Sequence, residues 1–377
     1  MSTVPVTPPE RSEPSPPPSP VESTRQRGGH GTPLPAAHAQ QQVTDWPASR
    51  VFSVPSAADE GPPDAVSGVA GRVSAVAAEL PGPSAPEGVA CGLGRASVAR
   101  VCDFLLGGGY NAAVDRELAR QVLAAAPEMR RVARAYRYFL YRAVGYCLRA
   151  GVRQFLDIGC GAPSAGCVHE VAQRADPGAR VAYVDIDPFV VELARSKVAG
   201  SRGVCVFEED VRRPEAVLDR PELGRVLDLG EPVAVVLGSV LQFLGGADDP
   251  AGVVGRLLAP LAAGSVLVVS HAATGGGLDW GPVRRVYGQA GVSVTARSRA
   301  QVEELFGGLG LVEPGVVWLP QWRPEPGDVV RVGDGRWSGG LAGVGRKAVA
   351  AGRDVAGARR RARRRGSPAG GRLRPVM

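Results

Sequence analysis

The sequence predicts a doubly wound α/β fold from three observations. Short apolar runs rich in β-branched residues recur between residues 150 and 275, and each run ends in Gly, Asp or Ser. An amphipathic stretch of helical period separates each run from the next. The runs are apolar along their whole length, which is typical of parallel strands covered by helices on both faces. Strands that alternate with helices in this way build a parallel sheet.

The expected elements follow in chain order. Residues 115–150 predict two helices, broken near Pro127, that form a helical cap over the edge of the sheet that binds ligands. The five expected parallel strands are residues 153–159, 180–187, 203–210, 232–240 and 264–272. The expected helices between them include residues 164–175, 188–199 and 249–262. Residues 310–319 and 341–350 are expected to close the sheet as an antiparallel pair.

Composition sets the limits of the folded part. Residues 1–90 hold 17 of the 33 prolines and no sustained apolar period, so we expect a disordered, Pro-rich region. Residues 351–377 are expected to form a second disordered region, an Arg-rich tail. One domain then spans residues 91–350, with the helical cap at about 96–150 and the core at about 151–350.

The positive charge of the chain belongs to its C-terminus. Residues 353–377 carry nine Arg and one Asp, a local charge of +8, whereas the whole chain carries +7, which leaves about −1 for residues 1–352. One interpretation is a solvated extension whose Arg content reflects a GC-rich coding sequence. The other is an electrostatic arm for nucleic acid or an anionic surface. Nucleic acid is therefore a candidate partner only through this tail.

The sequence predicts no metal site, no disulfide framework and no membrane span. The six cysteines show no paired C-x-x-C spacing, and only four His accompany them, so neither a metal site nor a disulfide framework is predicted. No 18 apolar residues run together, and the N-terminus lacks the pattern of a signal peptide. We therefore expect no membrane span and a cytoplasmic protein.

The glycine-rich stretch "FLDIGCGAPSAG", residues 155–166, follows the first strand. Gly159 and Gly161 allow the backbone to approach a ligand closely, and a helix starting near Ser164 would offer its N-terminal amides. A dinucleotide-binding turn has its third glycine three residues after the second, but Gly166 lies five residues after Gly161. With Asp157 ahead of it, the stretch reads D-x-G-x-G, the turn used by S-adenosylmethionine-dependent methyltransferases.

Carboxylates follow the next two strands. Asp185, 26 residues after Gly159, ends the second strand and is suited to accept hydrogen bonds from both ribose hydroxyls. Asp187 points the opposite way along the strand, so only one of the two is expected to reach a ligand. Asp210, at the end of the third strand, is suited to accept from an adenine amino group. With no basic residue expected beside these carboxylates, the pattern favours an uncharged adenosine over a phosphorylated nucleotide.

Several segments together resemble one family. They are residues 96–119, 155–173, 183–188, 249–254, 270–272, 311–315, 321–324 and 343–347. The chain resembles the bacterial S-adenosyl methyltransferase family, once catalogued only as a domain of unknown function. The resemblance implies a Rossmann-like class I methyltransferase fold and S-adenosylmethionine as cofactor. Members commonly read "YDYLLGGKDNF" where this chain reads "CDFLLGGGYNA" at residues 102–112, and loss of activity is one consequence that this departure leaves open.

Candidate groups for catalysis follow the later strands. His271, expected just after the fifth strand, is the candidate general base, although it could instead only hydrogen-bond a neighbouring loop. Ser239 and Gln242 follow the fourth strand, where methyltransferases commonly orient the acceptor, and Ser239 is also a candidate cofactor contact. His169 is expected to be structural. Four aromatic residues are candidates either for an acceptor pocket or for the core: Tyr110, Trp280, Tyr287 and Trp322.

Three functions are compatible with these features. The first is an S-adenosylmethionine-dependent methyltransferase acting on a small-molecule acceptor. The second is a regulatory protein that binds the cofactor but has lost turnover, which the altered residues 102–112 would explain. The third is a nucleic-acid methyltransferase that uses the Arg-rich tail, but the fourth strand is followed by "GSVLQF" and not by the "NPPY" type of motif that grips a flipped base.

Overall fold

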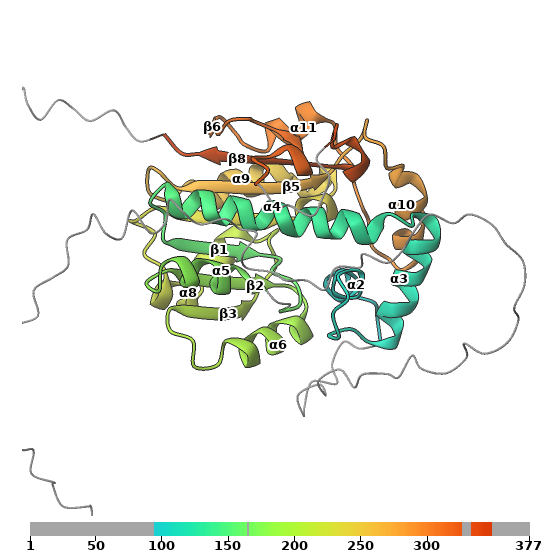
Figure 1. The fold of residues 1–377 in the computed structure, drawn as a ribbon. Coiled ribbons are helices and arrows are strands. Elements are labelled where there is room, and N and C mark those ends of the chain that lie inside the picture. Colours follow the sequence, from blue (N-terminus) through green and yellow to red (C-terminus); the bar gives the residue numbers. More distant parts are fainter. Residues whose placement is uncertain (1–93, 164–165, 326–332, 349–377) are drawn as a thin grey trace, which may run out of the picture.

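Eight strands form one sheet in the order β3-β2-β1-β4-β5-β8-β6, and β7 also pairs with β8 (Figure 1). The computed structural model describes residues 94–163, 166–325 and 333–348. The strands are β1 (Gln154–Ile158), β2 (Arg180–Asp185), β3 (Val204–Glu208), β4 (Val233–Gly238), β5 (Val266–Ala272), β6 (Gly310–Leu311), β7 (Val317–Trp318) and β8 (Gly340–Arg346). The five expected parallel strands are therefore all present. The regions expected to be disordered lie outside the described residues.

The strand order reverses at the centre of the sheet. β1 pairs in parallel with β2 on one side and with β4 on the other, so the strand order reverses between β1 and β4. Ligands in such sheets bind beyond the carboxyl ends of the strands at this reversal. At the far edge β8 runs antiparallel to β5 and pairs with β6 and β7, which confirms the expected antiparallel closure. The doubly wound α/β fold is confirmed.

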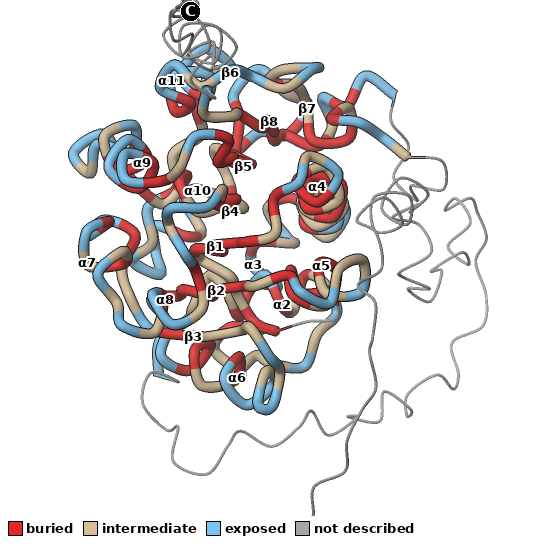
Figure 2. Tube along the Cα trace, turned by 90° about the vertical axis from the view of Figure 1, so that its left-hand side faces the viewer, coloured by how far each residue is buried: buried red, intermediate tan, exposed pale blue. Residues whose placement is uncertain are grey.

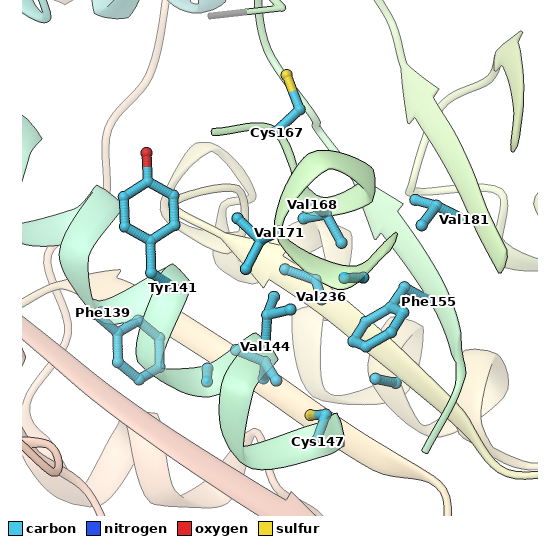
Figure 3. Packing of buried hydrophobic residues seen from close by; sticks show 14 of the residues in the cluster. Phe139, Tyr141, Val144, Cys147, Phe155, Cys167, Val168, Val171, Val181 and Val236 are labelled. Carbon is cyan, nitrogen blue, oxygen red and sulfur yellow. The ribbon is translucent and has the colours of Figure 1, made fainter. Parts of the chain in front are cut away.

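Helices cover both faces of the sheet (Figure 2). α4 (Met129–Arg149), α5 (Val168–Ala175) and α6 (Pro188–Val198) pack on one face. The other face is covered by α7 (Pro214–Leu218), α8 (Pro221–Val226), α9 (Pro250–Leu258) and α11 (Arg299–Glu304). Figure 3 shows Val144 of α4 and Val171 of α5 pointing toward Val236 of β4. Each large apolar side chain buried in this way contributes about 1.5–3 kcal/mol to the hydrophobic stabilisation of the fold.

A third apolar cluster lies at the carboxyl edge of the sheet. It joins α2 (Val98–Leu105), α3 (Ala113–Ala125) and α10 (Trp280–Gln289) to the first turns of α4. The break near Pro127 is confirmed, because α3 ends at Ala125 and α4 begins at Met129. The expectation that both helices belong to the cap was wrong for most of α4. This helix has 21 residues, and from Ala135 onward its apolar side chains pack on the face of the sheet.

Candidate functional site

The glycine turn follows β1 in the conformation that the sequence predicts. Gly159 has φ +70° and Gly161 has φ +69°, values in the left-handed region that favours glycine. A Cβ on Gly159 would lie 2.3 Å from Cγ2 of Val240, because the chain after β4 packs directly on the turn. A Cβ on Gly161 would meet no described atom within 4 Å, so the backbone there borders open space. The first glycine serves packing and the second leaves the backbone accessible.

Asp185, the last residue of β2, is bonded directly to this turn. Its carboxylate accepts hydrogen bonds from the amide of Gly161 (2.9 Å) and from the amide of Asp187 (3.0 Å). The side chain is only 5% exposed, and burial raises its pKa to about 6, although backbone amide hydrogen bonds oppose this rise. An ionised carboxylate has about four accepting positions, so this one is able to receive further donors such as a diol.

A cavity lies beside the turn, on the face covered by α4 and α5. Burial raises the pKa of Asp157 in β1 to about 7; the positive charge of Arg137 on α4 opposes this rise and the carboxylate of Asp185 adds to it. Both Arg137 and Asp157 line the cavity. Its other lining residues are Cys160, Gly161, Pro163, Cys167, Val168, His169, Tyr183, Ala194 and Val198. A cation and a carboxylate on one cavity match a ligand that carries both charges.

The helix after the turn begins later than expected. α5 starts at Val168, four residues beyond Ser164, which lies outside the described residues. The amide of Gly166 donates to Oε2 of Glu170 at 2.6 Å, so this group is already bonded within the chain. The helix therefore begins at Val168 and not near Ser164, and the expected cofactor contact of Ser164 itself lies outside the described residues.

Asp210 lies two residues beyond β3 and is paired with a cation. Nε and Nη2 of Arg212 donate to its carboxylate at 2.9 and 2.6 Å. Arg213 donates in the same way to Glu209 at 2.5 Å. The expectation of no basic residue beside the acidic strand ends was therefore wrong for this strand. Any contact between Asp210 and an adenine amino group has to share the carboxylate with Arg212.

Ile186 is an exposed apolar residue that the sequence analysis did not select. It follows Asp185 directly and is 57% exposed, more than most large apolar side chains of the described chain. An apolar side chain next to a ribose-binding carboxylate is suited to cover the face of an aromatic base. The exposure of a residue that follows a strand depends on the packing around it, which is why no sequence pattern singles out Ile186.

Ser239 is the first residue after β4 and is conformationally strained. Its φ is +60°, which is uncommon for a residue other than glycine and occurs often at functional sites. Its amide donates to the carbonyl and to the hydroxyl of Ser270, both at 3.1 Å. The Oγ is buried and faces the hydroxyl of Tyr136 on α4, which is also buried. Gln242, by contrast, uses its Oε1 to accept from the amide of Ala272 at 2.9 Å and is buried.

His271 is not placed as a general base. It is the sixth residue of β5, not a residue beyond it, and it is fully buried. Its Nδ1 lies 2.7 Å from the carbonyl of Ala272, so Nδ1 carries the proton, and Nε2 accepts from Arg297 at 2.6 Å. Burial, together with the charge of Arg297, lowers its pKa to about 4, although the hydrogen bond to the Ala272 carbonyl opposes this shift. The imidazole lone pair that a base needs is already engaged by Arg297, which disfavours the predicted role of general base and favours the alternative of a purely hydrogen-bonding residue.

The aromatic candidates belong mostly to the core. Trp322 is fully buried, in edge-to-face contact with Phe139, and Trp280 donates from Nε1 to the carbonyl of Gly339 at 2.8 Å. Tyr287 is also buried, within the cap cluster, whereas Tyr110 is half-buried.

His169 is hydrogen-bonded to Tyr183, which fits the expected structural role, and it also lines the cavity beside the turn. Its Nδ1 lies 2.8 Å from the hydroxyl of Tyr183, and the same hydroxyl accepts from the His169 amide at 2.7 Å.

Within the described part of the chain, no three His, Cys, Asp or Glu residues gather in a way that could hold a metal ion. Among these residues, no helix combines the length and the apolar character that crossing a membrane requires.

The altered segment near residue 105 is held by Asp103. Its carboxylate accepts from the amide of Tyr110 (2.8 Å) and from Nδ2 of Asn111 (2.7 Å). A Cβ on Gly108 would lie 2.0 Å from Oδ1 of Asp103, so only glycine fits there without movement. The residues that keep the family pattern are therefore those that hold the loop.

Comparison with known proteins agrees with this geometry. A profile of the S-adenosyl methyltransferase family matches residues 89–348. A candidate methyltransferase from Thermobifida fusca YX is 37% identical, with a TM-score of 0.64, and the match covers 70% of this chain and all of that one. A DUF574 family protein from Streptomyces avermitilis MA-4680 is 35% identical, with a TM-score of 0.62, over 68% of this chain and 98% of that one. No curated protein matches.

The family match covers more than half of the chain and includes β1, β2 and the glycine turn between β1 and α5. The strand order with its antiparallel β8, the turn at Gly159 and Gly161, and the carboxylate at the end of β2 fit S-adenosylmethionine as the cofactor. The chain belongs to the S-adenosyl methyltransferase family and is an S-adenosylmethionine-dependent methyltransferase.

Proposed function

We propose that the protein transfers the methyl group of S-adenosylmethionine to a small-molecule acceptor at the carboxyl edge of the sheet. The observation that carries the placement of the cofactor is the arrangement of Asp185, Asp157 and Arg137 around the glycine turn. These groups suit the two polar ends of the cofactor, and the turn between them suits a close approach of its body.

Each end of the cofactor has a matching group. Asp185 would accept from the ribose hydroxyls, and Ile186 beside it would cover one face of the adenine. Asp157 and Arg137 would pair with the ammonium and the carboxylate of the amino-acid end, respectively. The raised pKa values of the two aspartates support this assignment, because buried carboxylates without a cationic or donor ligand are poorly solvated.

The cap supports a small acceptor. α2, α3 and α10 pack together with α4 over the edge where the site lies, which favours a ligand that fits beneath helices over an extended polymer. The Arg-rich tail, the feature that suggested nucleic acid, lies outside the described residues. Small molecules are therefore the first acceptors to test.

The chain contributes mainly binding and orientation to the reaction. When bound, S-adenosylmethionine supplies a methyl carbon that is made electrophilic by its sulfonium. The polypeptide holds the two substrates in line and keeps water out, which is where much of the rate enhancement of such a displacement arises. Because the lone pair of His271 is engaged by Arg297, we assign no protein base. The acceptor is expected to react as an anion or a neutral amine.

Calorimetry of S-adenosylhomocysteine binding to the full chain tests the cofactor placement. Asp185→Asn should weaken binding by about 2 kcal/mol, or about 30-fold, the usual contribution of hydrogen bonds to a charged group. Asp176→Asn is the matched control, because Asp176 is a half-exposed carboxylate that pairs with Arg153 away from the turn. Equal affinity of the wild type and Asp185→Asn would contradict the placement.

Transfer of a labelled methyl group in a cell extract tests the acceptor class. The extract is separated into small molecules, nucleic acid and protein after incubation with the full chain. Label in the small-molecule fraction is the expected result, and at a limiting concentration of labelled S-adenosylmethionine it should fall strongly with Asp185→Asn. Label confined to nucleic acid or protein would contradict the proposal and favour a macromolecular acceptor.

A further inference from the structure

A buried arginine ties two helices of the cap together. Arg100 of α2 is 1% exposed, and its Nε lies 3.0 Å from Oδ2 of Asp115 in α3, which is fully buried. Its Nη2 donates to the carbonyl of Arg95 at 2.6 Å. Asp115 also accepts from the amides of Ser97 (2.8 Å) and Ala112 (2.7 Å), so both helix starts depend on it. The guanidinium is therefore held firmly on the cap side.

The same guanidinium reaches the turn between β2 and α6. Its Nη1 lies 3.8 Å from Oδ2 of Asp187, and its central carbon lies 5.4 Å from the ring centre of Phe189. Asp187 caps α6 by accepting from the amide of Phe189 at 3.0 Å. The amide of Asp187 donates to Oδ1 of Asp185 at 3.0 Å. One chain of contacts thus runs from the cap through Asp187 to the carboxylate proposed to bind the ribose.

The charge of Asp187 makes this contact consequential. Its Oδ1 caps α6, but its Oδ2 is buried and has no hydrogen-bond partner among the described residues, so Arg100 is the cation that faces this oxygen. A mostly buried carboxylate that loses its cation is unfavourable, because the cap alone then offsets its charge. The orientation of the Asp187 side chain, and of the turn that carries it, therefore depends on Arg100.

We propose that Arg100 is a positioning residue for the cofactor site: it holds the Asp187 turn, and this turn aims the Asp185 carboxylate. The proposal rests on the proposed role of Asp185. It gives the N-terminal part of the domain a function in cofactor binding, since α2 contributes a charge to the cofactor side of the sheet as well as covering the edge.

The proposal predicts opposite electrostatic effects for its two charges. Burial raises the pKa of Asp185, and the charge of Asp187 raises it further. The other titratable groups whose charges interact with Asp185 are Asp157 and Cys160. Removing the charge of Asp187 should therefore lower the pKa of Asp185. Removing Arg100 leaves Asp187 uncompensated, which should raise the pKa of Asp185 and disorder the turn.

The test is the affinity of the full chain for S-adenosylhomocysteine between about pH 5 and pH 8. Asp187→Asn should keep the helix cap, since Asn caps as well as Asp. It should shift the acid limb of the affinity profile, where affinity falls as Asp185 is protonated, to lower pH. Arg100→Gln should weaken binding at about pH 7.5 by about fivefold and shift the acid limb to higher pH. The double variant should bind more tightly than Arg100→Gln alone, because the uncompensated charge is gone.

The matched control is Arg130→Gln. Arg130 also stabilises the cap, by donating to the carbonyls of Phe104 and Leu105, at 3.2 and 3.4 Å. A loss of affinity as large as that of Arg100→Gln would mean that the cap matters only as a whole, and would overturn the proposal. If Arg100→Gln fails to fold, the pH dependence of affinity in Asp187→Asn decides. An acid limb at the same pH as in the wild type would then overturn the proposal.

Asp185→Asn, measured in parallel, separates two kinds of failure. An unchanged affinity for this variant would reject the ribose assignment and, with it, the role of Arg100. A weakened affinity for Asp185→Asn together with additive effects of Arg100→Gln and Asp187→Asn would reject only the positioning role.

Discussion

Replacing Asp157 by Asn should stabilise the ligand-free protein by an amount that grows as the pH rises. Burial raises the pKa of Asp157 from 3.8 to about 7, so the folded chain holds this proton more tightly than the unfolded chain does. The stabilising contribution is fully present below pH 3.8 and is lost as the pH rises through about 7. A tenfold change in a protonation equilibrium corresponds to about 1.4 kcal/mol, so the whole loss is about 4 kcal/mol. An Asn side chain does not titrate and avoids this loss.

The assay is urea unfolding of both chains, without cofactor, at several pH values between about pH 4.5 and pH 8. The free energy of unfolding of Asp157→Asn, relative to that of the wild type, should increase by about 3 kcal/mol across this interval. Asp210→Asn is the matched control, because hydrogen bonds from Arg212 lower the pKa of Asp210 although burial opposes them. Its difference from the wild type should stay constant above about pH 5. A constant difference for Asp157→Asn as well would refute the idea of a buried carboxylate awaiting a cation.

Two further substitutions test the site at other points. His271→Ala should lower the stability by about 1–3 kcal/mol, because Arg297 loses a buried partner, and should leave turnover per folded molecule unchanged; a large loss of turnover in a fully folded variant would restore His271 as a base. In thermal unfolding, Gly159→Ala should destabilise the fold more than Gly161→Ala, because only the Cβ on residue 159 meets Val240. Adding Val240→Ala to Gly159→Ala should recover part of the lost stability. Equal effects of the two glycine variants would contradict the packing argument.

The parts of the site that the sequence predicted are those that local spacing determines. Gly159, Gly161 and Asp185 each sit at a strand end, and the alternation of strands and helices is enough to place parallel strand ends at one edge. Arg137 escaped prediction for the opposite reason. It is one of several arginines on α4, and only the packing of that helix along the sheet brings this one to the cavity beside Asp157.

The expectations at the start of α5 and at His271 failed for different physical reasons. The first depends on where a helix begins, and hydrophobic period places such a boundary only to within a few residues. α5 begins four residues later than the pattern suggested, whereas β5 ends at Ala272 as expected. For His271 the decisive contact comes from a residue distant in the sequence, because Arg297 donates to the imidazole lone pair that a base needs. No local spacing predicts that contact.

The departures from the family pattern at residues 102–112 do not break the loop that contains them. Tyr110 contributes its backbone amide to Asp103, which any residue except proline would provide, and Gly109 is exposed. The contacts that define the loop come from Asp103, Gly108 and Asn111, and all three are retained. Arg100, one helix turn before Asp103, completes the same helix with its link to Asp187. The retained contacts therefore keep the shape of the loop despite the altered residues, and the loop gives no structural reason for a loss of turnover.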